Sequence, residues 1–158
     1  TTTTSSTSTT TKSTTSTILS SFIGSTKVLM ADGKWVPIES IKIGSVVLSY
    51  NPSTSELYPN VVVARFNYSS NTIYIINDNL STDAYESFYV MRNGSYSWVR
   101  ASQLKIGDQI YDPLTGSNII VKSIDILHYS MSIPVYDIIG SEGNNFIVSG
   151  GYLADKLI

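Results

Sequence analysis

The feature of the sequence that most constrains the fold is a partial internal repeat. Four short motifs occur twice in the same order: DG at 32–33 and NG at 93–94, WV at 35–36 and 98–99, IKIG at 41–44 and LKIG at 104–107, and YNP at 50–52 and YDP at 111–113. Two copies are too few for a solenoid, in which each repeat stacks on several neighbours. The repeat therefore predicts one domain built from two related halves, with residues 41–44 and 104–107 in equivalent places about a pseudo-two-fold axis.

Short apolar or alternating segments, separated by turn residues, fill the chain between these motifs, and no segment keeps a 3.6-residue period. The expected strands are 28–30, 35–38, 46–50, 59–66, 72–76, 88–91, 96–99, 109–111, 119–126, 135–139 and 145–148. The run of three valines at 61–63 predicts a strand buried on both faces. Single helical turns are expected at 38–41 and 101–104. The pattern predicts an all-β fold, either a sandwich or a barrel.

The composition bounds the class of protein. A length of 158 residues suits one domain, and a hydrophobic fraction of 42% excludes global disorder. The net charge of −2 gives no electrostatic basis for binding nucleic acid. The chain has no cysteine, which excludes disulfides and thiolate chemistry. No apolar run approaches the roughly 20 residues of a membrane-spanning helix. We expect no cofactor and no membrane span.

An ordered series of further motifs runs from Ser21 to Leu153. The motifs are FIGSTKV at 22–28, ADG at 31–33, PIE at 37–39, SFYV at 87–90, LKIGD at 104–108, VYDI at 135–138 and NFIV at 145–148. Their order and rough spacing resemble the Hint domain, the fold shared by inteins and the autoprocessing part of hedgehog proteins. The resemblance implies a flat, horseshoe-like β domain with pseudo-two-fold symmetry, in agreement with the repeat.

The resemblance also implies a chemistry, which needs particular groups. Hint domains cleave the peptide bond before their first residue, where a Cys or Ser side chain attacks the preceding carbonyl. A Thr-x-x-His segment then holds and polarises that bond. Inteins end on a His and an Asn that cyclises, followed by a nucleophile. Ser21 falls at the first position and is the candidate nucleophile, but a hydroxyl is weak without an adjacent base.

The remaining catalytic positions of the family are changed in this chain. The Thr-x-x-His segment maps onto residues 83–86 (DAYE), or onto 82–85 with a one-residue slip, and neither contains His. Asn144 stands where the family often has His before Asn-Phe. Ala154, Asp155 and Lys156 stand where inteins have the His, the Asn and the following nucleophile. These departures predict a Hint fold that does not cleave itself.

His128 is the only histidine of the chain, and it lies near the end of a predicted strand, away from every mapped catalytic position. A single histidine among scattered carboxylates has no metal-ligand spacing. We therefore predict no metal site and a structural role for His128.

Residues 1–17 form an arm of Thr and Ser, interrupted only by Lys12. Low-complexity Ser/Thr tracts are typical of linkers and stalks. Threonine, however, favours extended structure, and an extended arm could add a strand to a sheet edge. We expect the arm to pair with another copy of the chain, and its threonines include Thr1, Thr4, Thr7, Thr10, Thr14 and Thr17. The β domain is expected over residues 18–158.

Three Asn-x-Ser sequons, at Asn67, Asn79 and Asn93, are candidate N-glycosylation sites. Together with the low charge they favour an extracellular, surface-exposed protein. The first hypothesis is a non-catalytic structural protein whose arm joins copies head to tail into a surface filament. Two alternatives stay open: an autoprocessing Hint domain that uses Ser21, and a monomeric adhesin or stalk module.

Overall fold

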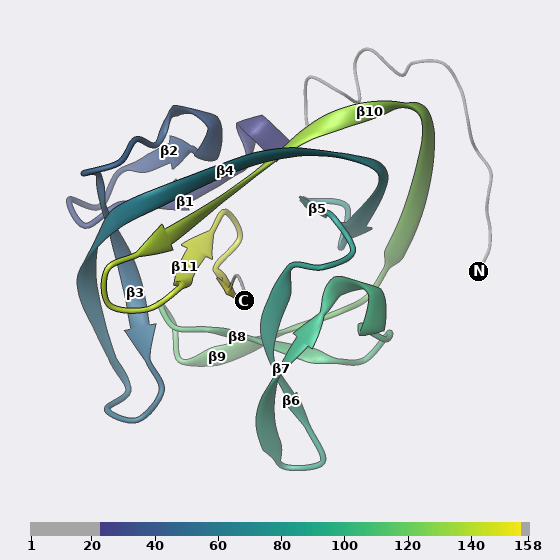
Figure 1. Ribbon diagram of the computed structural model, residues 1–158. Coiled ribbons are helices and arrows are strands. Elements are labelled where there is room, and N and C mark those ends of the chain that lie inside the picture. The colour runs from purple at the N-terminus through teal and green to yellow at the C-terminus, as the bar shows by residue number, and fades with distance from the viewer. Residues whose placement is uncertain (1–22, 156–158) are drawn as a thin grey trace.

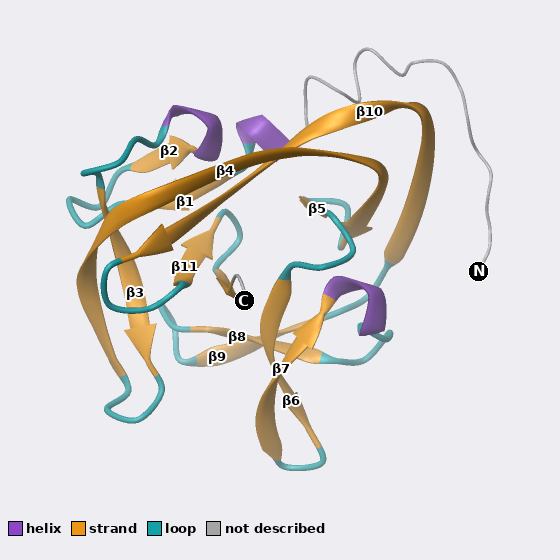
Figure 2. Ribbon diagram, in the orientation of Figure 1, coloured by secondary structure: helices purple, strands orange, loops and turns teal. Residues whose placement is uncertain are grey.

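The computed structural model describes residues 23–155. This part of the chain is almost entirely β (Figure 2). The strands are β1 (Lys27–Leu29), β2 (Trp35–Pro37), β3 (Val46–Asn51), β4 (Glu56–Ile76), β5 (Leu80–Thr82), β6 (Ser87–Arg92), β7 (Ser95–Arg100), β8 (Gln109–Asp112), β9 (Ser117–Ile120), β10 (Ile124–Gly140), β11 (Asn145–Val148) and β12 (Tyr152–Asp155). Within residues 23–155 the helical elements are three 3₁₀ turns, η2 (Ile23–Ser25), η3 (Ile38–Ser40) and η4 (Ala101–Gln103). The all-β prediction is confirmed, and η3 and η4 lie where single helical turns were expected.

The strands form two sheets. One has eight strands in the order β2-β1-β11-β12-β6-β8-β9, with β7 paired to β6. The other has the order β10-β4-β3, with β5 paired to β4. The long strands β4 and β10 run side by side and curve over the eight-stranded sheet (Figure 1). The main core lies between the two layers and includes Val28, Val62, Phe88 and Ile110, all fully or almost fully buried.

The internal repeat is reproduced in the hydrogen bonds of the backbone. In the first copy the Gly44 N–H donates to the Val62 carbonyl at 2.8 Å, and the Val62 N–H donates to the Ser45 carbonyl at 2.8 Å. In the second copy the Gly107 N–H donates to the Val121 carbonyl and the Val121 N–H to the Asp108 carbonyl, again at 2.8 Å each. Both glycines have φ of 96°, a conformation that only glycine adopts without strain. The predicted equivalence of 41–44 and 104–107 is confirmed.

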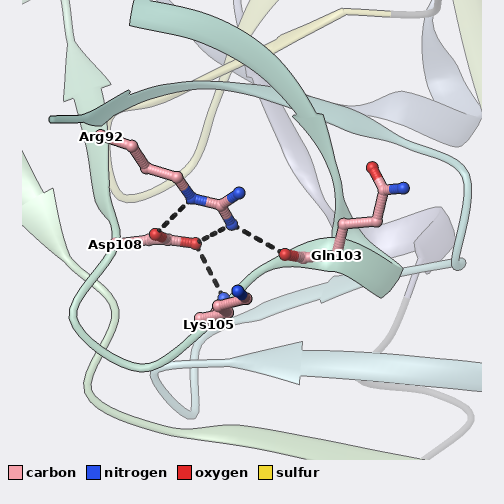
Figure 3. Close-up of polar contacts among 4 residues, drawn as sticks. All are labelled: Arg92, Gln103, Lys105 and Asp108. Carbon is pink, nitrogen blue, oxygen red and sulfur yellow. Dashed lines mark hydrogen bonds and ion pairs between the residues drawn. The ribbon is translucent and has the colours of Figure 1, made fainter. Parts of the chain in front are cut away.

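One side-chain contact distinguishes the two copies of this turn. In the first copy, Ser45 Oγ accepts a hydrogen bond from the Lys42 N–H at 3.1 Å. In the second, Asp108 Oδ2 accepts from the Lys105 N–H at 2.8 Å, and the same carboxylate binds the guanidinium of Arg92 through two hydrogen bonds (Figure 3). The second turn is therefore tied by an ion pair to the hairpin of β6 and β7, whereas the first is closed by a hydroxyl alone.

The pseudo-two-fold axis passes through the hairpin of β11 and β12. Val28 of β1 pairs with Val148 of β11, and the equivalent Phe88 of β6 pairs with Ala154 of β12. This places the axis between Ile147 and Leu153, which pair directly. On the same face the equivalent residues Tyr50 and Tyr111 contact each other, with ring centroids 5.2 Å apart. The two halves therefore meet through the C-terminal hairpin.

Three expectations about strands were wrong. Segments 59–66 and 72–76 belong to one strand, β4, because β10 pairs with it across the polar stretch between them. Val62 is fully buried whereas Val61 and Val63 are 42% and 48% exposed, so the valine run has one buried face. Segment 119–126 is divided between β9 and β10. The strand is interrupted because the N–H groups of residues 122 and 123 donate hydrogen bonds to Asn77 Oδ1 and not to a neighbouring strand. Strands β5 and β12 were not predicted.

No helix among residues 23–155 has the length and hydrophobicity to cross a membrane. Residues 1–17, and therefore the predicted arm and its boundary at residue 18, lie outside the described residues.

Candidate functional site

A recess lies between the curved β4–β10 pair and the eight-stranded sheet. Its apolar wall comes from the core strands, and its polar residues come from β4, β5, β10, the segment between β5 and β6, and Thr26 just before β1. The residues that line it are Thr26, Ile38, Tyr68, Leu80, Ser81, Thr82, Asp83, Glu86, Phe88, Val135, Tyr136, Phe146, Val148 and Ala154. It contains equivalent residues from both halves, for example Val148 and Ala154, so it straddles the pseudo-axis.

The segment that follows β5 places two carboxylates at this recess. Asp83 Oδ1 accepts hydrogen bonds from the N–H groups of Tyr85 at 3.0 Å and Glu86 at 3.1 Å. These two bonds close a turn of the type that Asp favours. The turn presents the side chain of Glu86 to the recess, and the Glu86 carbonyl accepts the Ala101 N–H at 2.8 Å, which fixes the segment against η4.

Tyr68, from β4, lines the recess together with Asp83 and Glu86. Burial raises the pKa of Tyr68, and the charges of Asp83, Asp137 and Glu86 raise that pKa further. A raised pKa keeps the phenol protonated, so that Tyr68 acts as a hydrogen-bond donor and not as a base. Asp137 is itself buried, and its Oδ1 accepts from the Ile138 N–H at 3.0 Å. The polar side of the recess thus combines hydroxyl groups with the carboxylates of Asp83 and Glu86.

The residues mapped onto the catalytic positions are only partly brought together. Glu86 and Ala154 both line the recess. Asp155 does not: neighbouring residues of a strand point to opposite faces, and Asp155 pairs across the sheet with Ser87 and Asn145. Burial on that opposite face raises the pKa of Asp155 to about 6. Asn144 does not line the recess.

Two further candidates lie elsewhere. Ser21, the candidate nucleophile, is outside the described residues. His128 lies exposed within β10, where its Nδ1 is 3.2 Å from Thr72 Oγ1, and it does not line the recess. Of the described residues that line the recess, none is His, Lys or Arg. No group of three or more possible metal-ligating side chains occurs within residues 23–155.

Sequence reasoning missed the tyrosines of the recess. Tyr136 falls in the VYDI motif but had no assigned role, and Tyr68 falls in a polar stretch that has the composition of a loop. Both line the recess, where the long strands β4 and β10 pair side by side, with Asn67 opposite Tyr136 and Tyr68 opposite Val135. The motif could have directed attention to Tyr136; no local signal marks Tyr68.

The three predicted sequons all have exposed asparagines. Asn67 lies within β4, and Asn93 at the tip of the β6–β7 hairpin. The side chain of Asn79 is engaged, because its Oδ1 accepts a hydrogen bond from the Tyr152 hydroxyl at 3.0 Å. Their exposure is compatible with glycosylation, which stays a prediction.

Comparisons with known proteins agree with this architecture. No family model and no curated protein sequence matches the chain. Among solved structures, a bacterial intein-like domain from Clostridium thermocellum superposes with a TM-score of 0.75 at 24% identity, over 86% of this chain and 97% of that one. This chain has the Hint fold. A DnaB intein from Synechocystis gives a TM-score of 0.69 at 19% identity, over 86% of this chain and 97% of the intein. The TvoVMA intein gives a TM-score of 0.67 at 20% identity, over 84% of this chain and 94% of the intein.

The predicted pseudo-two-fold Hint fold is therefore confirmed. At these identities the likeness concerns the fold, and a shared fold does not carry function with it. What this Hint domain does has to be argued from its own side chains.

Proposed function

We propose that this Hint domain is a non-catalytic, extracellular structural domain whose Thr/Ser arm joins copies of the chain into a filament. The observation that carries the first part is the lining of the recess. Peptide cleavage in the manner of the family needs a group that transfers protons near neutral pH. The described lining has no histidine, lysine or arginine, and the positions that should supply histidines hold Glu86 and Ala154.

The carboxylates of the recess do not replace those histidines. Asp83 is occupied by two backbone N–H groups, which is the role of a turn-forming side chain. Tyr68 is held protonated by burial and by the carboxylates around it. The carboxyl with a near-neutral pKa, Asp155, points to the opposite face of the sheet. This arrangement supports a recess that serves packing and not proton transfer.

The proposed contact between copies uses the free edge of β10. Strand β10 is an edge strand of its sheet: of the described strands, it pairs with β4 alone. Its outer part exposes Ile126 and Met131, which are 48% and 72% exposed. An unpaired edge offers backbone groups to an added strand, and exposed apolar side chains add contact area. Residues 1–17 of a second copy are the proposed added strand, because their threonines favour extended backbone.

The proposal is tested by comparing the full chain with a variant that lacks residues 1–17. Light scattering and electron microscopy should show polymers for the full chain and a folded monomer for the truncated one, because the core begins after the arm. The double variant Ile126→Asp/Met131→Asp should also weaken assembly. Ile43→Asp is the control for a charge placed on an exposed apolar residue, since the 67% exposure of Ile43 falls between those of Ile126 and Met131, but Ile43 lies in the turn before β3.

Three other results would each contradict one part of the proposal. Polymers formed by the truncated chain would contradict the role of the arm. A full chain that stays monomeric at all concentrations would contradict the filament and favour the adhesin or stalk module. Equal loss of assembly in the Ile43→Asp control would show that the contact lies elsewhere than on β10.

A further inference from the structure

A cluster of five aromatic side chains lies on the face of the eight-stranded sheet that is opposite the recess. Tyr89 stacks on Tyr96 with ring centroids 4.8 Å apart and contacts Trp98 at 4.9 Å. Tyr111 lies edge-on to Tyr96 at 5.5 Å and contacts Tyr50 at 5.2 Å. Four of these residues are half-buried, whereas Tyr50 is only 6% exposed. The rings therefore form a continuous series of contacts that ends on a buried tyrosine.

Within this cluster the pair of Tyr50 and Tyr111 has a geometry of its own. Their hydroxyl oxygens are 3.4 Å apart, closer than their ring centroids at 5.2 Å, so the two rings converge at their hydroxyl ends. The ring planes are inclined to each other by 46°. Tyr89 and Tyr96, in contrast, are stacked with only 10° between the planes, and Tyr111 stands edge-on to both at 82° and 76°.

This geometry fits a carbon–carbon bond between two phenol rings. Oxidised phenols couple through the carbons next to the one that carries the hydroxyl, and the coupled rings are twisted about the new bond. Rings that converge at their hydroxyl ends with inclined planes bring those carbons together, as Tyr50 and Tyr111 do. The Tyr96 hydroxyl instead donates to Asn118 Oδ1 at 2.7 Å. Of the tyrosine pairs in the cluster, Tyr50 and Tyr111 are therefore the pair set for coupling.

We propose that Tyr50 and Tyr111 form an oxidative cross-linking site, at which a haem peroxidase acting with hydrogen peroxide couples the two rings into dityrosine. Each phenol loses one electron and its hydroxyl proton. The two radicals form one bond between the carbons next to their hydroxyl-bearing carbons, and the hydrogens of the bonded carbons move to the phenolic oxygens, which restores both hydroxyls. The chain loses two hydrogen atoms in all, and one molecule of hydrogen peroxide is reduced to two molecules of water.

The cluster lets an oxidant in solution reach the buried ring. Electrons are drawn first from the half-buried rings, and rings in contact pass electrons to one another, so that Tyr50 is oxidised through Tyr111. The hydrogen bond with Tyr50, together with burial, raises the pKa of Tyr111 to about 12. The phenol is therefore neutral before oxidation, and its proton leaves with the electron to water at the half-buried Tyr111.

The cross-link would join the two related halves of the domain covalently. Tyr50 belongs to β3 and Tyr111 to β8, and the two residues are 61 positions apart in the chain. The chain has no cysteine, so no disulfide can make this connection. A covalent link that closes such a loop lowers the conformational entropy of the unfolded chain. The Tm should therefore rise by about 10 °C on cross-linking, by analogy with a disulfide that closes a loop of this length.

The test treats the full chain, at low concentration, with a haem peroxidase and hydrogen peroxide, once in native buffer and once in urea. In native buffer the monomer should gain dityrosine fluorescence and lose the mass of two hydrogen atoms. Peptide mapping should link the peptide of Tyr50 to that of Tyr111. Tyr50→Phe and Tyr111→Phe, which keep the rings, should abolish this link. Tyr96→Phe is the matched control, because it removes a phenol of the same cluster and leaves the pair intact, so the link should persist.

The unfolded chain and the control variant supply the results that would overturn the inference. In urea the eleven tyrosines of the chain should couple without selectivity, so an equally selective link in urea would show that the folded geometry does not direct the reaction. Native coupling of other tyrosines in preference to Tyr50 and Tyr111, or oxidation without dityrosine, contradicts the inference. Loss of the link in Tyr96→Phe as complete as in Tyr50→Phe contradicts its assignment to this pair.

Discussion

The ion pair between Arg92 and Asp108 gives the sharpest prediction about stability, because the repeat supplies its own control. The Asp108 carboxylate accepts three hydrogen bonds: from Arg92 Nε at 2.8 Å, from an Arg92 terminal nitrogen at 2.6 Å and from the Lys105 N–H at 2.8 Å. Arg92 also donates to the Gln103 carbonyl at 2.8 Å (Figure 3). One carboxylate therefore joins the β6–β7 hairpin to the turn before β8.

Replacing Asp108 by Ala should destabilise the domain by about 3 kcal/mol. Each hydrogen bond to a charged group is worth roughly 1.5–3 kcal/mol, and a broken pair leaves its partners unsatisfied. The Asp108 side chain is only 7% exposed, but that of Arg92 is 34% exposed, so water recovers part of the loss. The equivalent change, Ser45→Ala, removes one exposed hydrogen bond and should cost about 0.5–1 kcal/mol.

The free energy of unfolding of both variants is measured by urea unfolding, followed by Trp fluorescence. The m-value should stay unchanged, because the surface exposed on unfolding is the same. Burial alone would raise the pKa of Asp108, but the hydrogen bonds from Arg92 and Lys105 outweigh it and lower that pKa below its usual range. The stabilisation is therefore present above about pH 4, the unfolded value, and is lost as pH falls through the folded pKa. If Asp108→Ala lowers the free energy of unfolding by no more than Ser45→Ala does, this reasoning is refuted.

Two further predictions concern Asp155 and Ser21. The pKa of Asp155 is raised by burial to about 6, so the folded state holds a proton that the unfolded state releases, and stability should fall as pH rises from about 4 to 6. Asp155→Asn should remove that fall and raise the urea midpoint at pH 7; an unchanged pH profile would show that the carboxyl is solvated. The full chain should keep its intact mass after incubation with hydroxylamine or a thiol, because the recess holds no histidine among the described residues. A fragment that begins at Ser21 would establish the autoprocessing alternative.

The sequence predicted the symmetry of the fold because the symmetric turns need specific residues. Gly44 and Gly107 adopt positive φ, and each is the last residue of a motif that appears in both copies, so the repeat was visible without any tertiary information. The strand β4 was not predicted as one element, because its middle is polar. That middle is held by pairing with β10, a partner distant in sequence, and local composition does not record such pairing.

The candidate site was predictable only where it depends on the ordered motifs. Glu86 and Ala154, which the motifs align with catalytic positions of the family, both line the recess. Asp155 does not, because a single step along a strand reverses the face that a side chain occupies. Tyr68 was missed altogether, because its place depends on the curvature and register of β4 against β10.

The position of the C-terminal hairpin has a consequence for how the chain folds. Of the described strands, β11 and β12 are synthesised after all the others, yet they occupy the middle of the eight-stranded sheet, between β1 and β6. During synthesis the first half can close its β1–β2 hairpin, and the second its β6–β7 hairpin, but neither can join the other until the last strands emerge. The pairing of Val28 with Val148 closes a very long loop, and contacts between residues so distant slow folding. We expect the joining of the halves to be the late, rate-limiting event, during which the inner edges of β1 and β6 stay open to other chains.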